Sequence, residues 1–191
     1  MLSKAKIKLI QSLELKKKRR EERLFVAEGP KVVGDLLPYF TCRLIVASNS
    51  WLEQHPHIKA DEVIEATTDE LRKASFLNAP QDLLVLFELP DYPTPDNISY
   101  TELCLALDDI QDPGNLGTII RVADWFGIRH IFCSIGTTDA YSPKTVQASM
   151  GAVARVQMHY VDLPQYLSAV RSNHPKTPIY GTFLAGSNIY N

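Results

Sequence analysis

The chain has 191 residues, of which 45% are hydrophobic and 22% are charged. This length suits one ordinary domain or two small ones, and the composition excludes an intrinsically disordered chain. Uninterrupted apolar runs such as residues 83–87 are far too short to span a bilayer, and the N-terminus has no apolar signal core, so we expect a cytoplasmic protein with no membrane partner. The cysteines Cys42, Cys104 and Cys133 each lie alone in an apolar stretch, which predicts small buried side chains in a reducing compartment rather than disulfides or metal ligands.

The net charge of −2 conceals an uneven distribution. Residues 1–31 carry ten basic and four acidic side chains, a net charge of +6, so the remaining residues carry −8. A basic arm of this kind can bind a polyanion by releasing counterions, but it is also typical of a solvated helix end. Its densest part, the basic cluster, comprises Lys16, Lys17, Lys18, Arg19, Arg20 and Arg23.

The first half of the sequence mixes strands and helices. Apolar residues at helical spacing predict a helix over residues 3–15, capped by Ser3, that runs into the basic cluster. Further elements are expected as strands at 24–27, 43–47 and 83–89, a helix at 31–39 that follows Pro30, and a helix at 67–73 capped by Thr67 or Thr68. Prolines, aspartates and an asparagine within residues 91–97 predict a linker, which gives domains at 1–90 and 101–191 joined by residues 91–100.

The second half alternates between the two element types. Strands are expected at 103–107, 131–135, 156–161 and 179–184, and helices at 116–126, 143–150 and 164–170. This alternation predicts an α/β fold with a parallel sheet and crossover helices. Ligands of such sheets gather at the carboxyl ends of the strands, where loops 108–115, 136–142 and 185–191 begin. The first of these loops is the richest in polar groups.

The stretch LDDIQDPGNLGTIIRVADWFGI, residues 107–128, reads as a strand, a polar loop and a helix. Gly114 permits a tight turn, Asn115 can cap the helix, and Gly117 lets another backbone approach the first turn. Arg121 follows less than two turns after Asn115. The stretch is not the dinucleotide-binding pattern G-x-G-x-x-G, and it lacks the lysine of a phosphate-binding P-loop.

The pattern N-x-G-x-x-x-R-x-A-x-x-F-G, from Asn115 through Arg121 to Gly127, closely resembles the first signature motif of SpoU-type RNA 2′-O-ribose methyltransferases. Two other regions agree with this resemblance. SPK at 142–144 with ASMGA at 148–152 looks like the family's second helical region. FVAEG at 25–29 and NAPQ at 78–81 look like its N-terminal substrate-binding module, which is similar in fold to certain ribosomal RNA-binding proteins.

The resemblance covers nearly the whole chain. It implies a small N-terminal α/β RNA-binding domain followed by the N-terminal part of a parallel-sheet SPOUT-class methyltransferase domain. It further implies S-adenosylmethionine as cofactor, RNA (above all rRNA) as partner, no metal, and a homodimer. The family's later N-E-G and S-L-N motifs, which complete a trefoil knot around the cofactor, have no counterpart up to Asn191. We therefore expect a truncated chain that is inactive alone because its cofactor pocket is incomplete.

The resemblance assigns catalysis to Arg121 and Asn115. An arginine hardly deprotonates, so Arg121 is expected to bind phosphate and stabilise a developing alkoxide rather than act as a general base. Asn115 is explained equally well as a helix N-cap. The family places cofactor contacts at Thr182, Phe183 and Leu184, although a buried strand end explains these three residues more simply.

The basic cluster is expected to contact the RNA backbone, because the first domain resembles an RNA binder. Glu28 belongs to the same resemblance, but a carboxylate near a helix N-terminus already accounts for it. The five histidines show no ligand spacing. Two functions remain open: an S-adenosylmethionine-dependent RNA 2′-O-methyltransferase, and a non-catalytic RNA-binding protein that uses the basic arm and the first domain.

Overall fold

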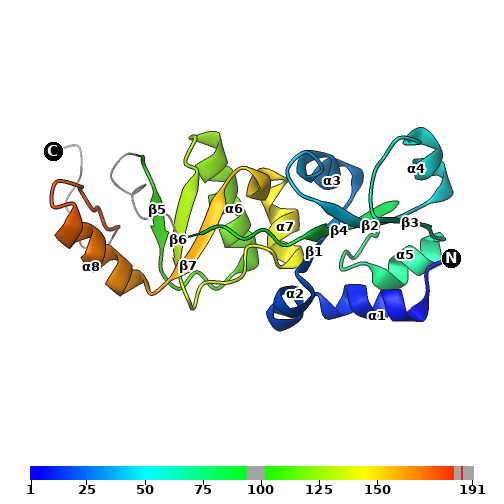
Figure 1. The fold of residues 1–191 in the computed structure, drawn as a ribbon, viewed down its shortest axis with the longest axis horizontal. Helices are drawn as coiled ribbons and strands as arrows, with labels where there is room; N and C mark the ends of the chain where they lie inside the picture. Colours follow the sequence, from blue (N-terminus) through cyan, green and yellow to red (C-terminus); the bar gives the residue numbers. More distant parts are fainter. Residues whose placement is uncertain (94–101, 183–185, 187–191) are drawn as a thin grey trace.

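The computed structural model describes residues 1–93, 102–182 and 186, which form two sheets with helices on their faces (Figure 1). The first sheet has the strand order β1-β4-β2-β3. β4 runs antiparallel to both β1 and β2, whereas β2 and β3 are parallel, so the sheet is mixed. The strands are β1 (Leu24–Glu28), β2 (Cys42–Ala47), β3 (Glu62–Glu65) and β4 (Leu83–Glu88).

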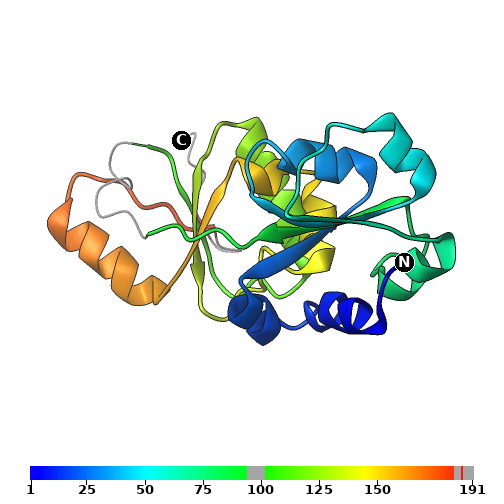
Figure 2. The ribbon, with the colours of Figure 1, turned by 45° about the vertical axis from the view of Figure 1, so that its right-hand side comes forward.

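Helices cover both faces of this sheet (Figures 1 and 2). They are α1 (Lys4–Ser12), α2 (Lys16–Glu22), α3 (Pro30–Leu36), α4 (Asn49–Gln54) and α5 (Thr68–Ala74). Alternate residues of β4 enter two different hydrophobic clusters: Leu84 joins the one under α1 and α5, and Val85 joins the one under α3. Residues 83–87 of β4 are all apolar because both faces of the strand are buried there.

The second sheet has three parallel strands in the order β5-β6-β7. It consists of β5 (Leu105–Leu107), β6 (His130–Ser134) and β7 (Gln157–Val161), with helices α6 (Pro113–Trp125), α7 (Pro143–Ser149) and α8 (Leu163–Asn173) and the short 3₁₀ turn η2 (Ala152–Ala154). On the side of α8, Phe132 stacks on Tyr166 with ring centroids 4.4 Å apart. The buried rings of His130 and His159 are joined there by a hydrogen bond of 3.1 Å.

One hydrophobic core joins the two halves. Phe25 of β1 packs against Tyr141, from the loop before α7, with ring centroids 5.0 Å apart, and Phe40 also contacts that tyrosine at 6.4 Å. Buried residues of α6, such as Leu116 and Ile120, belong to the same cluster. The expected division into domains 1–90 and 101–191 therefore stays a prediction, and residues 94–100 of the expected linker lie outside the described residues.

The expected α/β class, the parallel second sheet and most of the elements are confirmed. The helix expected over residues 3–15 instead breaks at Leu13, and a separate helix, α2, carries the basic cluster except for Arg23, which follows its last residue. Helix α4 and strand β3 were not expected. Thr67 caps α5 through a capping box with Glu70.

The strand expected at 179–184 is not formed by residues 179–182, and residues 183–184 lie outside the described part. Apolar residues alone do not make a strand, because its backbone groups need a paired neighbour, and residues 179–182 join neither edge of the second sheet. No helix within the described residues is both long and apolar enough to span a membrane.

Candidate active site and RNA-binding surfaces

The loops that follow β5 and β6 lie against each other at the carboxyl edge of the second sheet. Asp109 has a left-handed backbone (φ 53°), and its N–H donates to Ser134 Oγ at 2.9 Å. The side chain of Gln111 donates to Asp109 Oδ1 at 2.6 Å and to the carbonyl of Gly136 at 2.9 Å. Two of the three expected ligand loops thus meet, and the third, residues 185–191, lies outside the described part except for residue 186.

Asp112, not Asn115, caps helix α6. Its side chain accepts a hydrogen bond from the Asn115 N–H at 2.8 Å, so the N-cap role considered for Asn115 is wrong. Asn115 and Arg121 are both exposed and lie six positions apart, a rotation of about 120° around the helix axis. No hydrogen bond or ion pair within the described residues joins them, so one chain does not bring these two candidate catalytic residues together.

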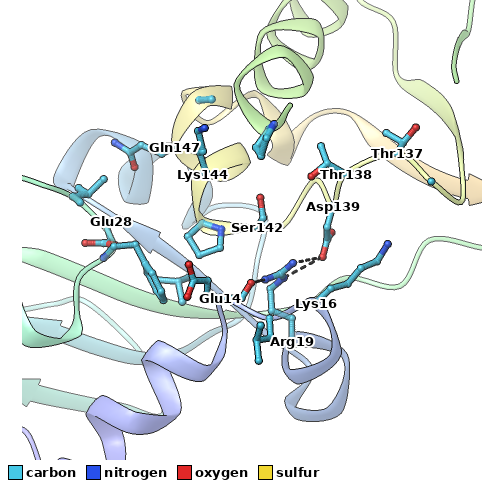
Figure 3. Close-up of a pocket in the computed structure, with 18 of the residues that line it drawn as sticks. Glu14, Lys16, Arg19, Glu28, Thr137, Thr138, Asp139, Ser142, Lys144 and Gln147 are labelled. Carbon is cyan, nitrogen blue, oxygen red and sulfur yellow. Dashed lines mark hydrogen bonds and ion pairs between the residues drawn. The ribbon is translucent and has the colours of Figure 1, made fainter. Parts of the chain in front are cut away.

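A cavity of about 930 Å³, the interdomain cavity, opens between the two halves (Figure 3). The first half contributes the α1–α2 turn, the end of β1 and residues 76–77. The second half contributes Pro113 at the start of α6, the loop after β6 and the start of α7. Its charged side chains are Glu14, Lys16, Arg19, Glu28, Asp139 and Lys144. The volume is within the range of ligand-binding clefts, and the cavity reaches the first turn of the motif helix.

Glu28 is buried at the edge of this cavity and has defined partners. Its carboxylate accepts hydrogen bonds from Ser75 Oγ and from the Phe76 N–H, the latter at 2.8 Å. Burial raises the pKa of this carboxyl, and the hydrogen bonds oppose that rise only in part. The expected explanation, a carboxylate near the N-terminus of α3, is incomplete, because Glu28 holds the segment after α5 against the end of β1.

Arg19 connects the two halves and is 2% exposed. It donates to the carboxylate of Asp139, at 3.1 Å from Nε and 2.6 Å from Nη2 (Figure 3). It also donates to the carbonyls of Leu13 and Glu14, at 2.7 Å each. A buried guanidinium satisfied in this way is not available to an RNA phosphate. The structure therefore removes Arg19 from the expected RNA-binding set.

The other members of the basic cluster are more accessible. Lys17 and Lys18 form exposed ion pairs with Glu21, at 3.8 and 2.7 Å, while Arg20 and Arg23 are exposed. Lys16 lines the cavity and lies 4.8 Å from the centre of the Tyr160 ring. The cluster therefore faces both solvent and the cavity.

The expected cofactor contacts do not form a group in the described part of the chain. Thr182 is exposed and lies outside any strand, and Phe183 and Leu184 are outside the described residues. The outer face of α6 carries exposed apolar side chains near Arg121: Val122 (48% exposed), Trp125 (86%) and Phe126 (73%). Such a patch on a folded surface is typical of a protein–protein contact.

Sequence reasoning did not identify Asp139 or Lys144 as site residues, although it had placed loop 136–142 at the sheet edge. Lys144 lines the cavity and lies 3.8 Å from the capping carboxylate of Asp112. For Asp139 the sequence signal was the loop's position after a strand, and for Lys144 it was the SPK segment at 142–144 in the family resemblance. Nothing in the sequence pairs Asp139 with Arg19, because 120 positions separate them.

Comparisons with known proteins agree with this arrangement. Residues 102–191 match the SpoU rRNA Methylase family, and residues 4–85 match the MRM3-like substrate binding domain. The mitochondrial rRNA methyltransferase 3 of Xenopus tropicalis is 31% identical over 85% of this chain and 42% of its own length. The 23S rRNA (guanosine(2553)-2′-O)-methyltransferase RlmP of Bacillus subtilis is 25% identical over 97% of this chain and 73% of its own.

Solved structures similar to this chain are also described as RNA methyltransferases. A protein of Porphyromonas gingivalis assigned to the TrmH family of RNA methyltransferases is 42% identical, with a TM-score of 0.81 over 91% of this chain and 68% of that one. An AdoMet-bound rRNA methyltransferase of Sinorhizobium meliloti is 31% identical, with a TM-score of 0.74 over 90% and 67%. The chain thus spans 42% of the Xenopus protein and about two thirds of these structures.

Proposed function

Because the chain belongs to the SpoU rRNA methylase family, we propose that it serves the transfer of a methyl group from S-adenosylmethionine to a ribose 2′-hydroxyl of RNA, with rRNA as the substrate. The observation that carries this proposal is the motif helix α6, which starts at the carboxyl edge of the parallel sheet and beside the interdomain cavity. Ligands of parallel α/β sheets bind at that edge.

S-adenosylmethionine supplies an activated methyl group, so the protein must position the hydroxyl and stabilise charge on its oxygen. Arg121 is the exposed cation of the motif and is assigned to that oxygen or to the neighbouring phosphate. Asn115, at the start of the same helix, is assigned to substrate. Thr182, Phe183 and Leu184 are assigned to the cofactor, on the family resemblance alone.

RNA is proposed to approach over the basic cluster, through Lys16, Lys17, Lys18, Arg20 and Arg23. A homodimer is proposed through the apolar outer face of α6, because Val122, Trp125 and Phe126 are exposed next to Arg121. A second copy on this face would also place that arginine at the edge of the interface. Trp125→Glu should then shift sedimentation toward the monomer, whereas Val63→Glu, a control on β3, should not.

The activity is tested with the purified protein, tritiated S-adenosylmethionine and purified rRNA. We expect label that survives alkaline hydrolysis as a 2′-O-methylated dinucleotide. Arg121→Gln should lower the transfer rate by about a hundredfold or more without changing cofactor affinity. Arg129→Gln, an exposed arginine just after α6, is the matched control. RNA binding without any methyl transfer by the unaltered protein would support the non-catalytic RNA-binding protein instead.

A further inference from the structure

A second depression, the α1–α5 groove, lies in the first half of the molecule and is separate from the interdomain cavity. It has a volume of about 490 Å³. Four cations line it, Lys4 and Lys8 from α1 and Arg72 and Lys73 from the end of α5, together with Ile7, Gln11 and Ser75. No carboxylate is among these lining residues.

Hydrogen bonds at both ends of α1 fix the walls of the α1–α5 groove. The Leu2 N–H donates to Glu70 Oε1 at 3.1 Å, and Gln11 Nε2 donates to the carbonyl of Lys73 at 2.6 Å. Beneath them, Ile10 and Leu71 are buried in one cluster. The groove is therefore held open by the fold and needs no ligand to form it.

The acidic groups near the groove are already engaged. Glu70 is occupied by the capping box with Thr67 and by the Leu2 N–H. Asp69 forms an exposed pair with Arg72, at 3.3 Å. Glu62 pairs with Lys6, which does not line the groove. Lys4, Lys8 and Lys73 have no ion-pair partner among the described residues.

Helix stability does not explain the lysines of α1. Lys4 is its first residue, where the helix dipole favours an acidic side chain, and the first turn contains no acid. Lys4 and Lys8 lie one turn apart, where like charges repel. The two cations of α5 lie in its last turn, where the helix dipole favours them. The lysine pair on α1, which faces them across the groove, has no such explanation, and an anionic ligand would supply one.

The groove adjoins the interdomain cavity. Ser75 lines the groove, and the next two residues, Phe76 and Leu77, line the cavity. Glu28 holds this segment by accepting hydrogen bonds from Ser75 and Phe76. A strand lying in the groove would therefore pass over residues 75–77 into the cavity, toward Pro113 at the start of the motif helix.

We propose that the α1–α5 groove binds the phosphate backbone of single-stranded RNA and directs that strand into the interdomain cavity. This rests on the proposed function and adds an entry path that the basic cluster alone does not supply. Lysine side chains that contact phosphates give affinity that is independent of sequence and strongly dependent on salt.

The test measures binding of a short, fluorescent single-stranded RNA of mixed sequence to the full chain. The groove variant is Lys4→Gln, Lys8→Gln and Lys73→Gln together. The control variant, Lys59→Gln, Arg171→Gln and Lys176→Gln, removes three exposed charges elsewhere. Three lost phosphate contacts should lower the slope of log affinity against log salt by about 2, so the defect of the groove variant should shrink by about 20-fold between about 50 and 200 mM salt. The control should keep the slope of the unaltered protein.

Lys4→Glu separates binding from folding. It places an acid in the first turn of α1 and opposite Lys8, which should leave the melting temperature unchanged or slightly higher, while RNA affinity falls. A groove variant with unaltered RNA affinity and salt slope would contradict RNA binding in the groove, even if the protein methylates rRNA. RNA binding through the groove without methyl transfer would contradict the proposed function but support the groove as an RNA-binding site.

Discussion

Two glycines at the same helical position give opposite predictions for the same substitution. Gly34 is the fifth residue of α3 and Gly117 the fifth residue of α6. A Cβ added at Gly34 meets nothing within 4 Å. A Cβ added at Gly117 would lie 2.5 Å from Ala148 Cβ and 2.9 Å from both Ala148 C and Ser149 N. Gly117→Ala should therefore destabilise the fold, whereas Gly34→Ala should stabilise it.

The magnitudes follow from two opposing terms. Alanine in place of glycine within a helix gains about 0.5–1 kcal/mol, and this gain applies at both positions. At position 117 the clash is with the backbone of α7, which cannot move aside as a flexible side chain can, and overpacking of this kind costs about 1–3 kcal/mol. The difference between the two terms gives an expected net loss of up to about 2.5 kcal/mol for Gly117→Ala, and a loss of about 1 kcal/mol lowers the melting temperature by about 2–4 °C for a chain of this size.

Thermal unfolding followed by circular dichroism, with urea titration as a check, measures both variants. Because α7 carries Lys144 and Gln147 into the cavity, Gly117→Ala should also weaken RNA binding, whereas Gly34→Ala should not. The close helix approach would be refuted as the reason for glycine at position 117 if both alanine variants were stabilised equally.

Three further predictions concern buried groups. Arg19→Met should lower the free energy of unfolding by about 3–5 kcal/mol because it leaves Asp139 without its ion-pair partner. In urea titration, the loss for Arg19→Met combined with Asp139→Leu should be smaller than the sum of the two single losses. Burial lowers the pKa of His130 and lowers that of His159 to about 4, so in mildly acidic solution the unfolded chain binds more protons than the folded one. The free energy of unfolding should therefore decrease as the pH falls from about 6.5 to about 4, and it should decrease less in His159→Gln. A flat profile over that pH range would contradict this. Burial raises the thiol pKa of all three cysteines, to about 11 for Cys42 and to about 12 for Cys133, and only Cys104 is partly accessible. A thiol reagent at neutral pH should therefore label Cys104 first, which mass spectrometry of the labelled peptides can check.

Much of the fold could be predicted because it rests on local signals. Alternating strand and helix patterns predicted the parallel sheet β5-β6-β7, and the prolines at positions 30 and 143 marked helix starts that the structure confirms. Position also predicted that the loops after β5 and β6 would meet, because parallel strands end at a common edge. The motif helix was expected three residues late, since the proline and glycine before Asn115 were taken for a turn.

The remainder depends on contacts between distant residues. Arg19 was assigned to an exposed basic cluster because its neighbours are lysines and arginines, yet it is buried against Asp139. A run of charged residues in the sequence does not indicate which of its side chains points into the protein interior. Strand β3 has only four residues, three of them exposed, so it has no apolar pattern from which a strand could be predicted. Residues 179–182 show the opposite error, since Ile179 and Tyr180 suggested a strand but have no paired neighbour there.

The position of Arg19 also bears on how RNA would reach the proposed methyl-transfer site. Had the basic cluster been a free arm, it could have bound RNA independently of the second half. Instead Arg19 ties the α1–α2 turn to Asp139 in the loop after β6, and Glu28 ties the end of β1 to residues 75–76. Both links border the same cavity, so its two walls come from different halves but are held in one arrangement. Under the proposed function, RNA bound to the first half would therefore lie at a fixed distance from α6, and specificity for an RNA shape could arise from this fixed spacing without any contact to its bases.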